Sequence, residues 1–253
     1  MELTFITYVL LWVTGFFAGF VDSIAGGGGI ITIPVFLALG FDPHMALGTN
    51  KLQASFGSLT ASVHYARSGL VDVKQTIEGV IFTAIGAALG TYSVQLINPA
   101  FLTHIILPML TLVFVYMLFS PDLGAMDKKP RVKTVPFYIV AGLTIGFYDG
   151  FFGPGTGSFW AVAFICLLGY NLKKATAHTK IMNFTSNVIS LTAFIIGKNV
   201  LFIPGIIMGT GQLLGATIGS HLVIRKGTKF IRFFFLAVVA ITIVKLIYST
   251  YIK

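Results

Sequence analysis

The sequence predicts an all-α protein that crosses a membrane many times, on three observations: its composition, the lengths of its apolar stretches and an internal repeat. Of the 253 residues, 56% are apolar and only 10% are charged, and the mean hydropathy is +0.90. Soluble domains average about 25% charged residues. A water-soluble chain of this length could not bury so much apolar surface, so we expect a lipid bilayer to surround most of the molecule.

Ten apolar stretches follow one another along the chain. They cover residues 3–21, 30–39, 52–66, 76–97, 101–119, 135–152, 158–168, 181–197, 201–224 and 230–248. A helix needs about 20 residues to cross a bilayer, so 30–39 and 158–168 are too short to cross as ordinary helices. Both follow a glycine-rich break, which predicts half-helices or re-entrant arms. The first stretch is expected to remain as a helix, because it lacks the basic start and the cleavage site of a signal peptide.

The two halves of the chain align with each other. In the first block, Gly15, Gly19, Phe20, Asp22, Gly26 and Gly28 recur 127 residues later as Gly142, Gly146, Phe147, Asp149, Gly153 and Gly155. In the second block, Gly40, Ala46, Lys51, Gly86, Ala87 and Gly90 recur 129 residues later as Gly169, Ala175, Lys180, Gly215, Ala216 and Gly219. Each repeat holds five apolar stretches (three or four full spans plus one half-helix or re-entrant arm). Because five is an odd number, the second repeat should be inverted in the membrane relative to the first. The expected division is a first repeat at 1–120, a basic cytoplasmic linker at 121–134 and an inverted repeat at 135–253.

The loop charges indicate the orientation, because cytoplasmic loops carry an excess of Lys and Arg. The linker holds four basic residues, Lys128, Lys129, Arg131 and Lys133. With the linker inside, the other basic loops at 67–74, 173–174 and 225–232 also fall inside, and both termini fall outside. The basic residues needed in the cytoplasmic loops thus explain the formal charge of +9. Nucleic-acid binding is not expected, since no basic stripe with interleaved aromatics lies outside the apolar stretches.

Glycine-rich breaks precede both short stretches. Glycine permits positive φ and close backbone approach, and a break leaves bare N–H groups at the start of the next half-helix, where the helix dipole attracts anions. Two such starts that meet near the midplane from opposite sides would form an anion site. Packing is the other interpretation of spaced glycines. It is favoured for Gly15/Gly19 and Gly86/Gly90, whereas a functional break is favoured for 26–29.

Two carboxylates, Asp22 and Asp149, lie within apolar stretches. Carboxylates inside membranes are costly and often belong to proton relays, but Asp also caps helix N-termini. Proton coupling and capping both stay open for each Asp. His178 is a candidate proton carrier, because imidazole titrates near physiological pH, or a polar residue at a helix end.

A lysine opens one span in each half, within "ALGTNKLQASFGS" and "ATAHTKIMNFTSN". Lys51 and Lys180 are either point-charge partners for an anion or lysines that snorkel to the membrane interface, and their equivalent places favour the first role. The candidate substrate-binding residues are the two breaks and the polar groups of these two motifs: Gly26, Gly27, Gly28, Gly29, Asn50, Lys51, Gln53, Gly153, Gly155, Thr156, Gly157, Lys180 and Asn183.

No hydrolytic or metal-binding apparatus is recognisable. The sequence has no Walker-type phosphate loop, no Gly-x-Ser-x-Gly elbow and no carboxylate-rich cluster, and its other histidines lack ligand spacing. The single cysteine, Cys166, excludes an intramolecular disulfide. We therefore expect neither an enzyme nor a bound cofactor or metal.

The paired motifs resemble those of the TauE/SafE family of membrane transporters. The first is "GFVDSIAGGGGIITIPVFLALGFDPHMALGTNKLQASFGS", and the second is "GFYDGFFGPGTGSFWAVAF" with "KKATAHTKIMNFTSN". The resemblance implies movement of sulfur-containing anions, such as sulfite and organosulfonates, across the bacterial cytoplasmic membrane. It also implies a binding role for the motif residues named above.

Residues and resemblance together predict a secondary transporter of a small anion, sulfite or another sulfur-containing anion, in the bacterial inner membrane. Proton coupling is assigned to Asp22, Asp149 and His178. The expected partners are the anion and the lipid bilayer. A second copy of the chain, in a homodimer, is a further candidate partner. The alternatives are a passive channel for an anion or small solute and a Na⁺-coupled carrier of another small organic anion.

Overall fold

The computed structural model describes residues 4–72, 74–119 and 126–225. These residues form nine α-helices and a short 3₁₀ turn, with no strand among them. The helices are α1 (Phe5–Ala25), α2 (Gly28–Ala38), α3 (Pro43–Arg67), α4 (Ile77–Gln95), α5 (Pro99–Phe119), α6 (Thr134–Phe151), α7 (Thr156–Leu168), α8 (Leu172–Ile196) and α9 (Phe202–Arg225). The predicted all-α class is confirmed for these residues. The last predicted stretch, 230–248, lies outside them, as do Lys226, Lys229 and Arg232 of the basic loop at 225–232.

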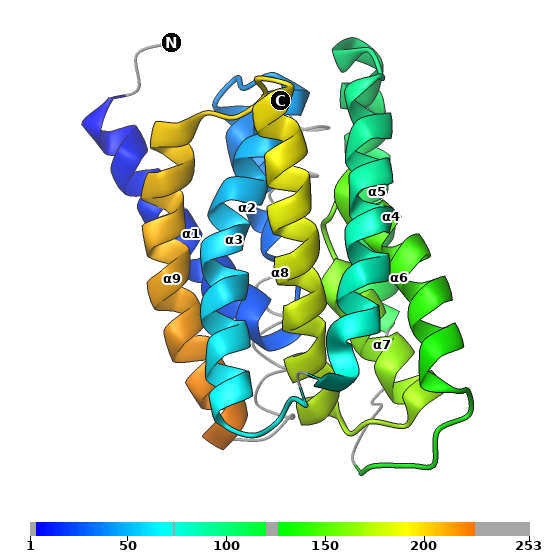
Figure 1. Cartoon of the computed structure of the whole chain (residues 1–253). Coiled ribbons are helices and arrows are strands. Elements are labelled where there is room, and N and C mark those ends of the chain that lie inside the picture. Colours follow the sequence, from blue (N-terminus) through cyan, green and yellow to red (C-terminus); the bar gives the residue numbers. More distant parts are fainter. Residues whose placement is uncertain (1–3, 73, 120–125, 226–253) are drawn as a thin grey trace.

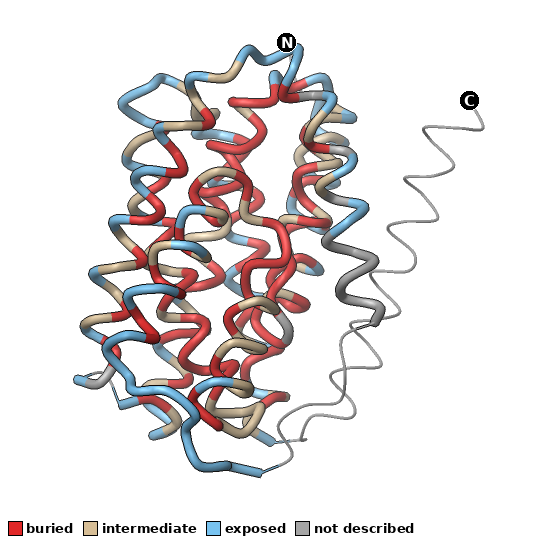
Figure 2. Tube along the Cα trace, turned by 90° about the vertical axis from the view of Figure 1, so that its right-hand side faces the viewer, coloured by how far each residue is buried: buried red, intermediate tan, exposed pale blue. Residues whose placement is uncertain are grey.

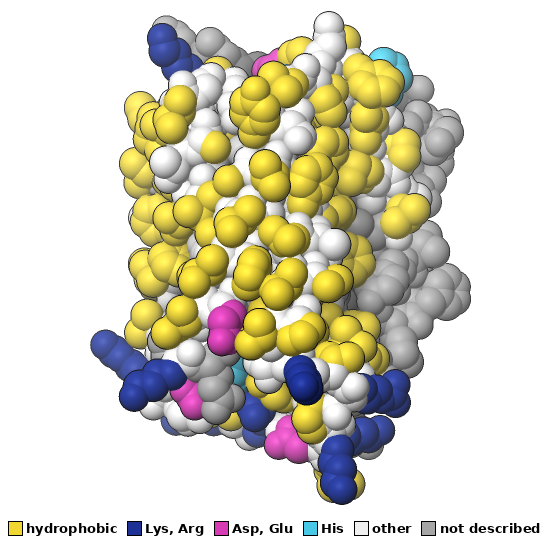
Figure 3. Space-filling model, turned by 45° about the vertical axis from the view of Figure 1, so that its right-hand side comes forward, with side chains coloured by type: hydrophobic (Ala, Val, Ile, Leu, Met, Phe, Trp, Pro, Cys, Tyr) yellow, Lys and Arg dark blue, Asp and Glu magenta, His cyan; other side chains and the backbone are white. Residues whose placement is uncertain are grey.

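The sides of the helix bundle are apolar. Within the described ranges, three helices are long and apolar enough to cross a membrane: α1 over Phe5–Ile24, α4 and α9. They present large apolar side chains outward, such as Phe17, Ile81 and Ile206, each 46–51% exposed. Apolar side chains cover the middle of the face in Figure 3, while most of its Lys and Arg side chains lie at the lower end. Soluble proteins rarely expose so continuous an apolar surface, so the molecule is a membrane protein.

Two helix hairpins are built around the glycine breaks. The 11-residue α2 follows α1, and the 13-residue α7 follows α6, so the two predicted short helices are present. Leu11, in the first half of α1, clusters with Phe36 near the end of α2 and with Phe41 shortly after that helix. In the second hairpin, the amide of Lys128, shortly before α6, donates to the carbonyl of Gly169 after α7 at 2.7 Å. Each short helix therefore turns back toward the end where its hairpin began (Figure 1).

The two longest helices, α3 and α8, each have 25 residues and pack against each other with opposite directions (Figure 1). The pairs α1/α9 and α4/α6 flank them. Cβ atoms added at Gly15, Gly19, Gly86 and Gly90 would lie 2.0–2.6 Å from carbonyl oxygens of the facing helix. The packing interpretation of these four glycines is confirmed.

The tips of the two hairpins touch in the middle of the bundle, where the tube of Figure 2 is largely buried. A Cβ added to Gly26 would lie 2.4 Å from the Cα of Gly157, and one added to Gly157 would lie 2.5 Å from the Cα of Gly26. Gly26 also has a φ of +70°, which favours glycine. The Ser158 hydroxyl donates to the carbonyl of Gly26 at 3.4 Å. The hairpins thus meet backbone to backbone.

Gly26→Ala is expected to destabilise the protein strongly, because its methyl group would overlap the backbone of Gly157. Gly69→Ala is the matched control: Gly69 has a φ of +73°, but nothing lies within 4 Å of an added Cβ. That variant should lose only the roughly 1–2 kcal/mol that left-handed backbone costs other residues. Melting temperatures in one detergent measure both variants, and equal losses would contradict the contact between the tips.

Candidate functional site

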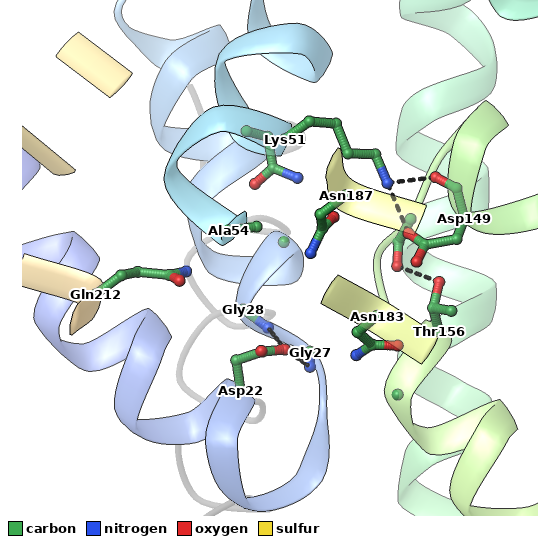
Figure 4. A pocket seen from close by; sticks show the side chains of 14 residues that line it. Asp22, Gly27, Gly28, Lys51, Ala54, Asp149, Thr156, Asn183, Asn187 and Gln212 are labelled. Carbon is green, nitrogen blue, oxygen red and sulfur yellow. Dashed lines mark hydrogen bonds and ion pairs between the residues drawn. The ribbon is translucent and has the colours of Figure 1, made fainter. Parts of the chain in front are cut away.

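A cavity lies at the hairpin tips, with further walls from α3, α8 and α9 (Figure 4). Its volume, with its open side included, is about 380 Å³. Eleven predicted site residues line it: Asp22, Gly27, Gly28, Gly29, Asn50, Lys51, Asp149, Gly153, Thr156, Gly157 and Asn183. Three other residues complete the lining: Ala54, Asn187 and Gln212. The fold thus brings most of the predicted residues to one place.

Lys51 of α3 forms an ion pair with Asp149 of α6 (Figure 4). Its Nζ lies 2.6 Å from Oδ1 of Asp149 and also donates to the backbone oxygen of that residue. The second carboxylate oxygen accepts a hydrogen bond from the hydroxyl of Ser186. Lys51 is 1% and Asp149 4% exposed. The ammonium group is therefore deep in the bundle, and the snorkelling interpretation is wrong for Lys51.

Lys180 of α8 forms the second ion pair, with Asp22 of α1. Its Nζ lies 3.1 Å from Oδ2 of Asp22, and Lys180 is fully buried, so it does not snorkel either. Oδ1 of Asp22 accepts the backbone N–H groups of Gly27 at 3.0 Å and Gly28 at 3.4 Å. These amides lie at the N-terminus of α2, so Asp22 caps that helix. Among the described residues, Asp149 accepts no backbone N–H and has no such capping role.

Each ion pair joins the two halves of the chain. Asp22 and Lys51 belong to the first half, Asp149 and Lys180 to the second, and each Asp pairs with the Lys of the other half. Two ammonium groups and two carboxylates bring the formal charge of the four groups to zero. The lysines, predicted as partners for an anion, are therefore occupied by carboxylates in this structure.

Comparison with known proteins identifies the family. The family model described as "Sulfite exporter TauE/SafE" matches residues 11–246. The chain belongs to the TauE/SafE family. The resemblance of the paired motifs is thereby confirmed, and this TauE/SafE protein is a membrane transporter.

Several relatives cover nearly the whole TauE/SafE chain. It is 43% identical over 242 residues to the "Probable membrane transporter protein YfcA" of Escherichia coli K12. The aligned region covers 96% of this chain and 90% of that protein. It is 45% identical over 223 residues to a "Probable membrane transporter protein" of Haemophilus influenzae, with 88% of each chain covered. A "Probable membrane transporter protein ORF9" of a Sinorhizobium species is 44% identical over 232 residues, covering 91% of this chain and 88% of that protein. No solved structure matches.

In this TauE/SafE protein, Gln53 lies behind Asn50 rather than in the cavity lining. Its Nε2 donates to Oδ1 of Asn50 at 2.7 Å, and the hydroxyl of Thr32 donates to the same oxygen at 2.6 Å. With its oxygen engaged, Asn50 directs Nδ2 toward Gly29, another lining residue. The location of Gln53 fits positioning of Asn50 rather than the predicted contact with substrate.

Three other predicted residues build the site without lining the cavity: Gly26, Gly155 and Lys180. His178 lies further away, in an aromatic cluster with ring centroids 5.7 Å from Phe164 and 4.9 Å from Tyr170. Its Nδ1 donates to the carbonyl of Lys174 at 2.8 Å. No hydrogen bond joins His178 to Asp22 or Asp149 in the described part of the chain, so its proposed part in proton coupling has no support from the geometry.

Two amides of the TauE/SafE cavity, Asn187 and Gln212, are absent from the predicted substrate contacts. Asn187 donates from Nδ2 to the hydroxyl of Ser58 at 3.3 Å. Gln212 is 1% exposed and comes from the middle of the apolar stretch 201–224. It is the one amide side chain of that stretch, and this is the signal that could have identified it, because polar groups in spans are costly.

Proposed function

We propose that this protein is a secondary carrier of a small sulfur-containing anion, sulfite or an organosulfonate, which binds in the cavity at the hairpin tips. The observation that carries the proposal is a pair of buried lysines: Lys51 lines the cavity, and Lys180 bonds to Asp22, which caps the start of α2. Ammonium groups and helix N-termini attract anions, and ionisable groups buried in a membrane mark ion pathways. The description of the family as sulfite exporters supports the sulfur chemistry.

The anion would enter by replacing a carboxylate as the partner of a lysine. A hydrogensulfite or sulfonate group offers an ammonium ion the same single negative charge and the same kind of acceptor oxygens as a carboxylate. At Lys51, the displaced carboxylate of Asp149 would be left buried without a counter-charge, which is costly, so it takes up a proton. With Asp149 protonated, the four groups carry a formal charge of +1, which one bound monoanion neutralises. We therefore expect anion and proton to move together.

Alternating exposure of the cavity would come from movement of one half of the chain against the other. The internal repeat and the loop charges support two inverted repeats with both termini outside the cytoplasm, in a bacterial inner membrane. The glycine contact between Gly26 and Gly157 and the two ion pairs all join the halves. These are the contacts that such a movement would rearrange.

Counterflow in proteoliposomes tests this function. Vesicles loaded with unlabelled sulfite or methanesulfonate should accumulate the labelled anion from outside, with saturation and with faster uptake under an inward proton gradient. Lys74→Ala, which removes an exposed lysine of the 3₁₀ turn, should behave like the wild type. Failure to move any sulfur anion would contradict the substrate class. Ohmic conductance would favour the channel, and uptake driven by a Na⁺ gradient would favour the Na⁺-coupled carrier.

A further inference from the structure

The side chain of Gln212 points into the cavity from α9, a helix outside both paired motifs. Figure 4 shows it on one side of the cavity, with Asp149 on the other. The counterpart of Gln212 in the first half, 129 residues earlier, is Thr83. Its hydroxyl donates to the sulfur of Met182 at 3.4 Å, and Thr83 is not part of the cavity lining. Gln212 therefore gives the cavity a polar group that the repeat does not duplicate.

The amide of Gln212 has no hydrogen bond to any described residue. Its Oε1 is buried without a partner, and Nε2 makes no bond within 4–72, 74–119 or 126–225. A buried amide without hydrogen bonds is costly, whereas an apolar side chain of the same length would fill the same space without that cost. The unused hydrogen-bonding capacity therefore indicates a ligand.

Two glycines leave room for this side chain, and a third lets α1 approach its backbone. A Cβ added at Gly57 of α3 would lie 2.1 Å from Oε1 of Gln212, and one added at Gly28 of α2 would lie 3.3 Å from Nε2. On α1, a Cβ at Gly19 would lie 2.3 Å from the backbone oxygen of Gln212. The amide is thus held between α3 and the start of α2, where the helix dipole is positive.

A second amide with unused capacity belongs to the same cavity. Asn183 of α8 is 5% exposed, and its Oδ1 is buried without a partner among the described residues. The other two amides of the lining are engaged, since Asn50 accepts two hydrogen bonds and Asn187 donates one. The uncommitted amides come from α8 and α9. Nε2 of Gln212 and Nδ2 of Asn183 donate no hydrogen bond to a described residue, and their N–H groups suit the several acceptor oxygens of an oxyanion.

We propose that Gln212, with Asn183, binds the oxygen atoms of the transported oxyanion through amide N–H groups, while a lysine supplies the opposite charge. This inference rests on the proposed function, because it assigns a contact within the same cavity. Gln212 would then set the affinity for the anion, and the free protein would carry the cost of an unsatisfied amide.

The test compares Gln212→Met with Gln95→Met, the same substitution in α4 at a glutamine that bonds to Thr91 and Asn199. Without anion, Gln212→Met should melt at or above the wild-type temperature, because it removes an unsatisfied buried amide. With sulfite or methanesulfonate, the wild type and Gln95→Met should gain melting temperature, since ligand binding stabilises the folded state, and Gln212→Met should gain far less. Its KM should rise about tenfold or more, as expected for a hydrogen bond to a charged group, with little change in maximal rate.

A second variant, Gln212→Glu, keeps the size of the side chain but adds negative charge and removes the donors. It should lose anion binding at neutral pH. If the wild type binds and transports an anion while both Gln212 variants keep its KM and its anion-dependent melting shift, the assignment of Gln212 is wrong and the proposed function stands. Loss of stability by Gln212→Met without anion would also overturn it, because the amide would then have a structural partner. A wild type that responds to neither sulfur anion would contradict the proposed function itself.

Discussion

Lys51→Met is expected to abolish anion transport and to lower stability by about 3–5 kcal/mol, the usual loss when one member of a buried ion pair is removed. The carboxylate of Asp149 would keep only the hydroxyl of Ser186 as a partner. Counterflow in proteoliposomes measures the first effect and denaturation in detergent the second. Lys74→Met, at an exposed position, is the control and should change neither.

The double variant Lys51→Met/Asp149→Leu separates the two effects. Replacing both members of a buried pair with apolar side chains is often neutral or stabilising, so most of the lost stability should return. Transport should not return, because the anion still lacks its ammonium partner. A double variant that transports like the wild type would mean that this ion pair is only structural.

Asp149→Asn is expected to uncouple the carrier from protons. The substitution keeps the shape of the side chain and frees Lys51 from its carboxylate, so the anion binds without displacing a charge. We expect counterflow to persist with anion affinity at least tenfold higher, since each tenfold step needs only about 1.4 kcal/mol. Acceleration by an inward proton gradient should disappear, which uptake at two external pH values measures.

The matched variant is Asp22→Asn, at the other ion pair. An amide oxygen there can still accept the N–H groups of Gly27 and Gly28, so the cap of α2 should survive. If Asp149→Asn still responds to the proton gradient and Asp22→Asn does not, the coupling carboxylate is Asp22. If both variants respond like the wild type, neither carboxylate carries the proton.

The sequence predicts the places of the short helices well, because glycine runs and span length are local properties. The lengths of α2 and α7 follow from the breaks before them. The repeat also indicates that Asp22, Asp149, Lys51 and Lys180 belong together. Which Asp meets which Lys depends on how the hairpin tips touch. That contact joins residues 131 positions apart, Gly26 and Gly157, so no local pattern encodes it.

Two predicted residues of the motifs lie away from the cavity for a geometric reason. Gln53 and His178 lie two positions from Lys51 and Lys180, and such neighbours on a helix point in nearly opposite directions. A motif thus marks a stretch of helix, but only one face of that stretch meets the cavity. Gln212 was missed for the opposite reason: it lies on the face of α9 that meets the cavity, but α9 carries no motif.

The crosswise ion pairs have a consequence for how the cell makes this protein. Lys180 follows Asp22 by 158 residues, and Asp149 follows Lys51 by 98. At ribosomal rates of about 5–20 residues per second, roughly 5–30 s pass before each early charge can meet its partner. Bare charges are costly in hydrocarbon, so the nascent first half must keep Asp22 and Lys51 near water or the insertion machinery. Only the arrival of the second half neutralises them, and a chain truncated in the linker would keep both early charges unpaired.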